Sequence, residues 1–364
     1  RGALTMQDAV VERRAAFDVG SGSTKLQVAD VDVLSGALVR VLHQSERPVK
    51  YAFDWKRHGR LSADIVEQGA AALAALATQA RLLGAVAYSA VATEVFRKAE
   101  NSAEVLALLA ARTGVEVAVV TQDDEARLGH ATAAVLAGRP LAELIAWDSG
   151  GGSFQITRMA PGATSGEVEA YVGALGASVA AAVMIEEVQR RSLRQVATPN
   201  PASVEEADAL VRLLGARLPP PPEWLRAGDR VTAIGGPNSI FNLAAQIAAA
   251  ERGDETGAAG GRRAVVSRAD ARAALLARCG ESDDVIAALG YDEVPLVVPK
   301  LCLLVAVMDA CGFEAVDYEP STGTCAALLG GAGPPRRPLL PPAEGEPAAS
   351  GASAGAPAAE PLSG

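Results

Sequence analysis

Two short segments of the chain each combine an aspartate with glycines and hydroxyl groups. The first contains Asp18, Gly20, Ser21, Gly22 and Ser23, and the second contains Asp148, Gly150, Gly151, Gly152 and Ser153. Because glycine has no side chain, its backbone N–H group can approach an anion closely. Each segment alone fits a structural hairpin equally well. Because the two segments occupy equivalent places, each after an apolar run, they predict two facing glycine loops that hold one phosphate chain.

The two aspartates indicate a metal ion. A carboxylate beside phosphate oxygens repels them unless a divalent cation lies between. Magnesium prefers carboxylate, water and phosphate oxygens as ligands. We therefore expect Mg²⁺, with Mn²⁺ as an alternative, and with Asp18 and Asp148 among its ligands.

The hydrophobic pattern places both segments at the ends of strands. In the first part of the chain we expect strands at 15–19, 25–31 and 38–43, then helices and strands in alternation at 63–83, 85–92, 103–113, 115–120 and 122–137. The plan restarts with strands at 144–148, 154–158 and 169–172, a helix from 177, a helix at 205–214, a strand at 231–234, a buried helix at 297–310 and closing segments at 316–318 and 325–329. This order predicts an α/β protein of two similar halves, β-β-β-α-β-α in each, with a cleft between them.

The expected boundaries follow from the same pattern. They are an N-terminal extension at 1–13, a first domain at 14–137, a second domain at 138–302 and a tail at 331–364, with the helix and strand near 303–330 joining the first domain. The tail is rich in Pro, Ala, Gly and Ser. Such a segment cannot offset its ordering entropy by burial, so it is predicted to be disordered.

Composition limits the kinds of partner. Lys and Arg number 33 against 43 Asp and Glu, a formal net charge of −10, which argues against a broad basic surface. With 4% aromatic residues, a base-stacking platform for nucleic acid is not expected. No apolar run reaches the roughly 20 residues that a membrane span requires, so no membrane partner is expected. The four cysteines match neither a CxxC pair nor a zinc module and read as buried thiols in a reducing compartment. We expect a cytoplasmic protein, with an organelle left open because the chain begins at Arg1.

Four motifs resemble those of the Ppx/GppA family of exopolyphosphatases and guanosine pentaphosphate phosphohydrolases. The motifs D-x-G-S-x-S, A-T-x-x-x-R-x-A-x-N, E-E-A-R-L and D-x-G-G-G-S match, in this order, residues 18–23, 92–101, 124–128 and 148–153, with Asp124 in place of the first glutamate. The resemblance covers residues 14–330 and implies a two-domain actin-like, ribonuclease-H-like fold. It also implies magnesium-dependent release of terminal orthophosphate from inorganic polyphosphate, or of the 5′-phosphate from guanosine pentaphosphate.

The resemblance assigns the catalytic role to Glu125, which would orient the attacking water. The alternative is that Glu125 and its acidic neighbours only complement the helix dipole. Arg97 is a candidate for binding phosphate oxygens, because a guanidinium fork matches phosphate geometry. For Arg127 a salt bridge is an equal alternative, and Lys25 either reaches phosphate or points to solvent.

A third loop matches the family's G-x-x-G-T motif only in part. It consists of Gly235, Gly236, Pro237, Asn238 and Ser239, and we expect it to help hold phosphate. Asn238 stands where a glycine is usual. Because Asn tolerates positive φ, the backbone path is expected to survive.

The chain departs from the family pattern at two places. Gln155 replaces a glutamate that is available as a second magnesium ligand, so we expect an amide oxygen to serve there and magnesium to bind more weakly. The segment 320–326 replaces an R-E-G element. The helical domain of long family members is not expected either, which favours short polyphosphates or a nucleotide pentaphosphate as substrates. A homodimer stays open.

Two other functions remain as alternatives. An actin-like ATP-dependent kinase shares both Asp-Gly turns and would use Asp148 rather than Glu125 as its base. A phosphate or alarmone sensor without catalysis is favoured only by Gln155 and the missing R-E-G element.

Overall fold

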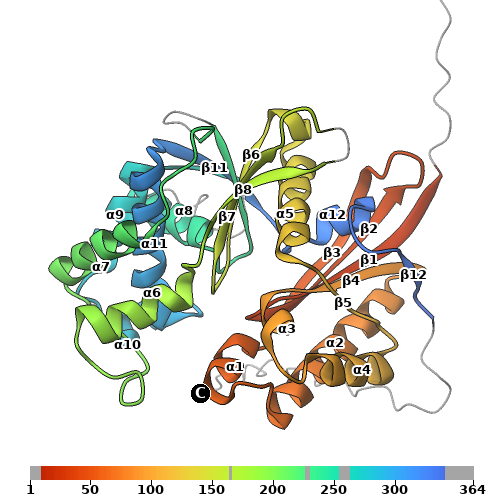
Figure 1. The fold of residues 1–364 in the computed structure, drawn as a ribbon, viewed down its shortest axis with the longest axis horizontal. Coiled ribbons are helices and arrows are strands. Elements are labelled where there is room, and N and C mark those ends of the chain that lie inside the picture. Colours follow the sequence, from red (N-terminus) through yellow and green to blue (C-terminus); the bar gives the residue numbers. More distant parts are fainter. Residues whose placement is uncertain (1–9, 164–165, 226–229, 254–262, 341–364) are drawn as a thin grey trace, which may run out of the picture.

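The computed structural model describes residues 10–163, 166–225, 230–253 and 263–340. Within these residues the chain forms two α/β halves, each built on one mixed sheet, and a helix lies between the two sheets (Figure 1).

The first sheet begins with an antiparallel meander and continues with parallel strands. Its order is β3-β2-β1-β4, and β5 and β12 share the free edge of β4. Strands β4 and β5 run parallel to β1, as expected for strands connected through helices. The strands are β1 (Val11–Val19), β2 (Ser23–Asp32), β3 (Leu38–Pro48), β4 (Ala87–Ala92), β5 (Ala118–Val119) and β12 (Arg337–Pro338).

The second sheet repeats this plan. Its order is β8-β7-β6-β9-β11, with β10 antiparallel at the edge, and β9 and β11 continue the direction of β6. Strand β11 therefore takes the place that β5 takes in the first sheet, and the expected two-half α/β plan is confirmed. The strands are β6 (Ile145–Ser149), β7 (Phe154–Met159), β8 (Val168–Gly173), β9 (Val231–Gly235), β10 (Ala264–Ser267) and β11 (Ala315–Pro320).

Helices in the first half cover one face of its sheet. They are α1 (Tyr51–His58), α2 (Ala63–Leu82), α3 (Glu94–Lys98) and α4 (Ser102–Thr113). Ser62 caps α2 by accepting a hydrogen bond from the Ile65 N–H. The apolar side of α2, with Leu73 and Leu76, then packs on Phe17 and Leu26 of the sheet.

The second half encloses a larger core around Trp147. Its helices are α6 (Ala177–Val183), α7 (Val204–Arg217), α8 (Ile240–Glu251), α9 (Arg268–Arg278), α10 (Asp283–Ala288) and α11 (Val297–Cys311). Trp147 contacts Phe154, Phe241 and Phe313 in edge or tilted geometry. The 18-residue stretch Val294–Cys311 is apolar enough to cross a membrane, but 72% of it is buried inside the structure. It is the central helix of this core.

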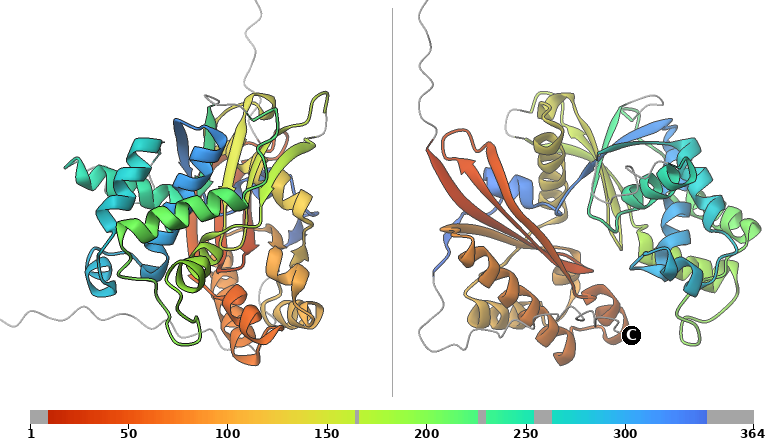
Figure 2. Two further views of the ribbon diagram at one scale, coloured as in Figure 1. Left: turned by 60° about the vertical axis from the view of Figure 1, so that its left-hand side comes forward. Right: turned by 180° about the vertical axis from the view of Figure 1, so that it is seen from behind.

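Two helices connect the halves. Helix α5 (Gln122–Ala137) is capped by Thr121, which forms a capping box with Asp124. Its Leu128 packs with Leu328 of α12 (Cys325–Gly330), and its Ala133 packs with Ala146 and Ile234 of the second sheet. The views in Figure 2 show α5 and α12 side by side between the two sheets.

The structure corrects the expected boundaries near 303–330. Helix α11 and strand β11 belong to the second half, because α11 is buried in the core of that half and β11 pairs with β9. Only α12 and β12 return to the first half, where Cys325 and Leu328 pack with Ala16.

Both ends of the folded region also differ from expectation. Strand β1 begins at Val11, so part of the expected 1–13 extension belongs to the first sheet. The predicted tail is ordered as far as 340, because β12 pairs with β4 and Leu339 enters the first core. Residues 341–364 lie outside the described range. The helices α1 and α3 were not expected from the sequence. Strand β3 runs to Pro48, whereas its expected end was residue 43.

The ordered start of the tail gives a stability prediction with a matched control. Leu339 is 8% exposed, and its neighbour Leu340 is 65% exposed. We expect Leu339→Ala to lower the free energy of unfolding by about 2 kcal/mol, and Leu340→Ala to change it by less than about 0.5 kcal/mol. Urea unfolding of both variants measures the difference. Equal stabilities would contradict the packing of β12 and Leu339 on the first sheet.

Candidate active site

The two Asp-Gly turns have the same geometry. The Gly20 N–H donates to the Ser23 carbonyl at 2.9 Å, and the Gly150 N–H donates to the Ser153 carbonyl at 2.9 Å. In each half the chain after the third strand then donates backbone N–H groups to carbonyls of its turn, Ala52 to Ser21 and Ser178 to Gly151. The turns are thus held open in equivalent places, at the ends of β1 and β6 that face the space between the halves.

A row of charged residues crosses the first sheet next to its turn. Asp18 on β1 is paired in register with Lys25 on β2, and Lys25 is paired with Glu46 on β3. Register partners lie on the same face, so the three side chains project together. Burial lowers the pKa of Lys25, but Asp18, Glu46 and Asp148 outweigh it and the pKa is raised. Lys25 therefore stays charged within a group of carboxylates.

Asp18 is fixed from the far end of the sequence. Its Oδ2 atom accepts the Thr324 backbone N–H at 2.9 Å and the Thr324 hydroxyl at 3.0 Å. The neighbouring Gly323 has a φ of +57°, and a Cβ there would lie 2.1 Å from the same oxygen. The loop after β11 thus requires glycine at 323 and orients the Asp18 carboxylate.

Glu125 lies in the first turn of α5, across from the second turn. The Arg97 Nη2 atom of α3 lies 2.8 Å from Glu125 Oε2, and Arg97 also donates to the Val120 carbonyl at 3.0 Å. Burial raises the pKa of Glu125 to about 7, with Asp148 and Asp18 adding to the rise and Arg97 opposing it. A glutamate with this pKa exchanges a proton near neutral pH.

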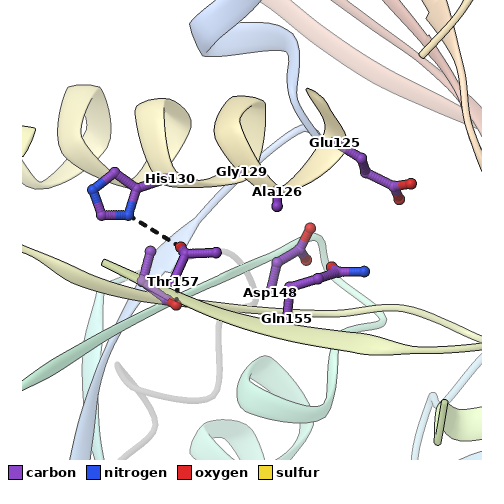
Figure 3. Close-up of a pocket in the computed structure, with 8 residues that line it drawn as sticks. Glu125, Ala126, Gly129, His130, Asp148, Gln155 and Thr157 are labelled. Atoms are coloured by element: carbon purple, nitrogen blue, oxygen red, sulfur yellow. Dashed lines mark hydrogen bonds between the residues drawn. The ribbon is translucent and has the colours of Figure 1, made fainter. Parts of the chain in front are cut away.

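The second sheet supplies the opposite wall. Asp148 on β6 and Gln155 on β7 are register partners, and Figure 3 shows both side chains projecting toward the side of α5 that carries Glu125. Burial raises the pKa of Asp148 to about 6, Lys25 opposes this and Asp18 adds to it. Buried carboxylates with raised pKa values mark a place where negative charge is incompletely neutralised.

The same wall fixes α5 farther from the turns. The Nδ1 atom of the buried His130 lies 3.1 Å from the Thr157 hydroxyl (Figure 3), and its Nε2 atom lies 3.0 Å from the Leu141 carbonyl. Burial lowers its pKa, so the ring is neutral. His130 therefore anchors α5 on the second sheet.

The oxygen atoms here fit a magnesium ion that keeps water or phosphate ligands. Asp18 raises the pKa of Asp148, and the Gln155 amide nitrogen donates to the Ser153 hydroxyl at 3.2 Å. Within the described residues no three His, Cys, Asp or Glu side chains form a metal cage. This donor set suits Mg²⁺, which is usually bound through one or two carboxylates plus substrate phosphates.

The third loop lies between β9 and α8. The Ser239 hydroxyl caps α8 by accepting the Asn242 N–H at 3.2 Å. Asn238 does not have a positive φ, contrary to the reason given for tolerating it, because positive φ occurs only at Arg190 among described residues other than glycine. Its carbonyl instead accepts a hydrogen bond from the buried Lys300 ammonium. The loop is held by α11 and α8, and its Gly236 lies toward Glu46 of the first half.

The predicted residues do not all meet. Electrostatic interactions connect Asp18, Lys25, Arg97, Glu125 and Asp148, and Gln155 lines the same small pocket as Glu125 and Asp148. Arg127 is exposed and pairs with Asp124, so the salt-bridge alternative holds for it. Sequence reasoning missed Thr324 and Glu46. Thr324 lies in the segment that replaces R-E-G, and Glu46 lies in the part of β3 beyond its expected end.

Comparison with known proteins places this geometry in context. The Ppx/GppA phosphatase family model matches residues 16–182. An uncharacterized protein of Streptomyces coelicolor is 31% identical over 144 residues, which are 40% of this chain and 42% of that protein. The chain thus matches less than half the length of this curated relative.

Solved structures share the fold over most of the chain. The Ppx/GppA family member of Aquifex aeolicus is 18% identical, with a TM-score of 0.66 over 88% of this chain and 97% of that chain. An exopolyphosphatase from Cytophaga hutchinsonii is 15% identical, with a TM-score of 0.67 over 88% of this chain and 96% of that chain. The two halves are thus those of the actin-like fold. Residues 16–182 thus match the Ppx/GppA phosphatase family, and the chain shares the fold of solved family members over most of its length.

Proposed function

We propose that this protein is a magnesium-dependent phosphoanhydride hydrolase that releases terminal orthophosphate from inorganic polyphosphate or the 5′-phosphate from guanosine pentaphosphate. The position of Glu125 carries the proposal. It is a largely buried carboxylate with a pKa of about 7, and that pKa is raised in part by the aspartate beside each glycine turn. The family and the fold shared with an exopolyphosphatase support the same reaction class.

Glu125 acts as the general base. It accepts a proton from a water molecule, and the water oxygen forms a bond to the terminal phosphorus. The bond from that phosphorus to the bridging oxygen breaks, and the shortened chain leaves as an anion with the electron pair. Arg97 holds the Glu125 side chain in place and keeps its pKa low enough for a useful fraction to be ionised near neutral pH.

The turns bind the phosphate chain through backbone N–H groups of residues 20–23 and 150–153, and Lys25 adds positive charge beside them. Asp18, Asp148 and Gln155 would hold Mg²⁺, which neutralises charge on the phosphate oxygens when bound. Thr324 keeps the Asp18 carboxylate oriented for this role.

A kinase is a second candidate because Asp148 is also a buried carboxylate in the cleft with a pKa of about 6. In that reaction Asp148 would take the proton of an acceptor hydroxyl, and Glu125 would be dispensable.

The first prediction separates these reactions. We expect Glu125→Gln to lower phosphate release from triphosphate, polyphosphate and guanosine pentaphosphate by at least about 100-fold, because a general base contributes about this much. Phosphate release is measured for each substrate. Asp123→Asn is the control, since Asp123 is an exposed carboxylate in the same turn of α5, and it should retain most of the activity. Full hydrolysis by Glu125→Gln would defeat the proposal, and ATP-dependent transfer retained with it would favour the kinase.

The second prediction concerns pH. Because Glu125 must be ionised and its pKa is about 7, kcat/KM should rise with pH below about 7 and level off above it. Arg97 lowers that pKa, so Arg97→Met should move the rising part to higher pH. Substrate ionisation is the same for both proteins, so the displacement between their profiles reports the enzyme. Superimposed profiles would contradict the Arg97–Glu125 coupling.

The third prediction concerns Gln155. Gln155→Glu adds a charged ligand opposite Asp148, so the magnesium concentration for half-maximal phosphate release should fall by about threefold or more. Titration with Mg²⁺ at a fixed substrate concentration measures this half-maximal concentration. Gln122→Glu, at the exposed start of α5, is the control for the added charge. An unchanged half-maximal concentration for Gln155→Glu would exclude a ligand role at this position.

A further inference from the structure

The glycine turns of the second half are faced by glutamates of the first. A Cβ built on Gly152 would lie 2.4 Å from Glu94 Oε2 and 3.1 Å from Glu94 Oε1. A Cβ built on Gly236 would lie 3.5 Å from Glu46 Oε2. Two loops proposed to receive phosphate therefore each have a carboxylate of the opposite half against them.

Glu94 is held in this place by a local network on α3. Its Oε1 atom accepts from the Lys98 ammonium at 2.6 Å, one helical turn later. Lys98 in turn lies 5.7 Å from the centre of the Trp55 ring. The Glu94 side chain is only 23% exposed, compared with 49% for Lys98. The carboxylate thus faces the turn, and its counter-ion faces solvent.

Glu46 belongs to the cross-strand row described above. It is the register partner of Lys25 and contributes to the raised pKa of that residue. It therefore places a second negative charge between the cation of the first half and the third loop of the second half.

We propose that Glu94 and Glu46 are specificity-determining residues that restrict the cleft to short phosphate chains, a role that rests on the proposed function. Each carboxylate repels phosphate groups that approach its glycine turn. The repulsion grows with the number of phosphates placed along the cleft, so long chains are penalised more than short ones. Lys98 moderates the charge of Glu94 and makes the restriction partial.

The experiment compares Glu94→Gln, Glu46→Gln and Lys98→Met with the wild type. We expect Glu94→Gln and Glu46→Gln to lower KM for long-chain polyphosphate by about threefold or more and to lower KM for triphosphate less. Lys98→Met should act in the opposite direction, because it leaves Glu94 without its partner. Added salt should shrink all three effects, since it screens charge.

Glu100→Gln is the matched control. Glu100 follows α3 and is exposed, so the same change of charge there should leave both KM values unaltered. If Glu94 and Glu46 only fastened the halves together, Glu94→Gln and Glu46→Gln would raise KM and the salt dependence would not change. That outcome, or equal effects of Glu94→Gln and Glu100→Gln, would overturn the proposal. Thermal unfolding identifies any variant that fails to fold, and Glu94→Asp, which keeps the charge, should then behave like the wild type.

A binding arm separates this inference from the proposed reaction. Triphosphate binding, with Mg²⁺ present, is measured by calorimetry for Glu125→Gln and for the double variant with Glu94→Gln. Tighter binding by the double variant supports the charge restriction even if no substrate is hydrolysed. If the two variants bind triphosphate equally and the wild type hydrolyses it, the restriction is overturned and the proposed function stands.

Discussion

The arrangement depends on negative charge that is gathered at the closest approach of the two halves. Asp18 raises the pKa of Asp148, both aspartates raise the pKa of Glu125, and the nearby positive charges of Lys25 and Arg97 oppose these rises. Burial is the largest cause of the raised pKa values of Glu125 and Asp148. A site of this kind costs folding free energy, and groups with raised pKa values concentrate where a protein binds or transforms a ligand. The surrounding structure serves to keep these carboxylates together.

Helix α5 is the element that makes this possible. Its capping box starts the helix beside the first half, its first turn carries Glu125, and its later turns pack on the second sheet through Ala133 and the buried His130. A small-residue surface lets the helix lie close to the sheet, which brings Glu125 to the level of Asp148. The last elements of the chain complete the support, because α12 packs on α5 and Thr324 holds Asp18.

Because the two halves repeat one plan, the same few residue types, Asp, Gly and Ser, form both glycine turns. Both halves use an antiparallel meander whose first turn has a Gly N–H donating to a Ser carbonyl three residues later, at 2.9 Å in each case. Two equivalent turns then face each other with an aspartate beside each. The net charge of −10 is compatible with a polyanionic substrate in such a structure, because backbone N–H groups and a few cations act locally. The remaining acidic side chains, such as Glu94, shape which polyanions are accepted.

Much of this follows from the sequence alone, and the rest has an identifiable cause. Local patterns determined most of the strands, the two Asp-Gly turns and the family motifs, because each depends on neighbours within a few residues. Partners distant in sequence were decided only by the tertiary structure. Examples are Thr324 on Asp18, Arg97 on Glu125 rather than on phosphate alone, and the placement of β11 in the second sheet. These contacts arise from strand register and from the packing of α5, α11 and α12, in which free energy is shared among many residues and no short segment contains the information.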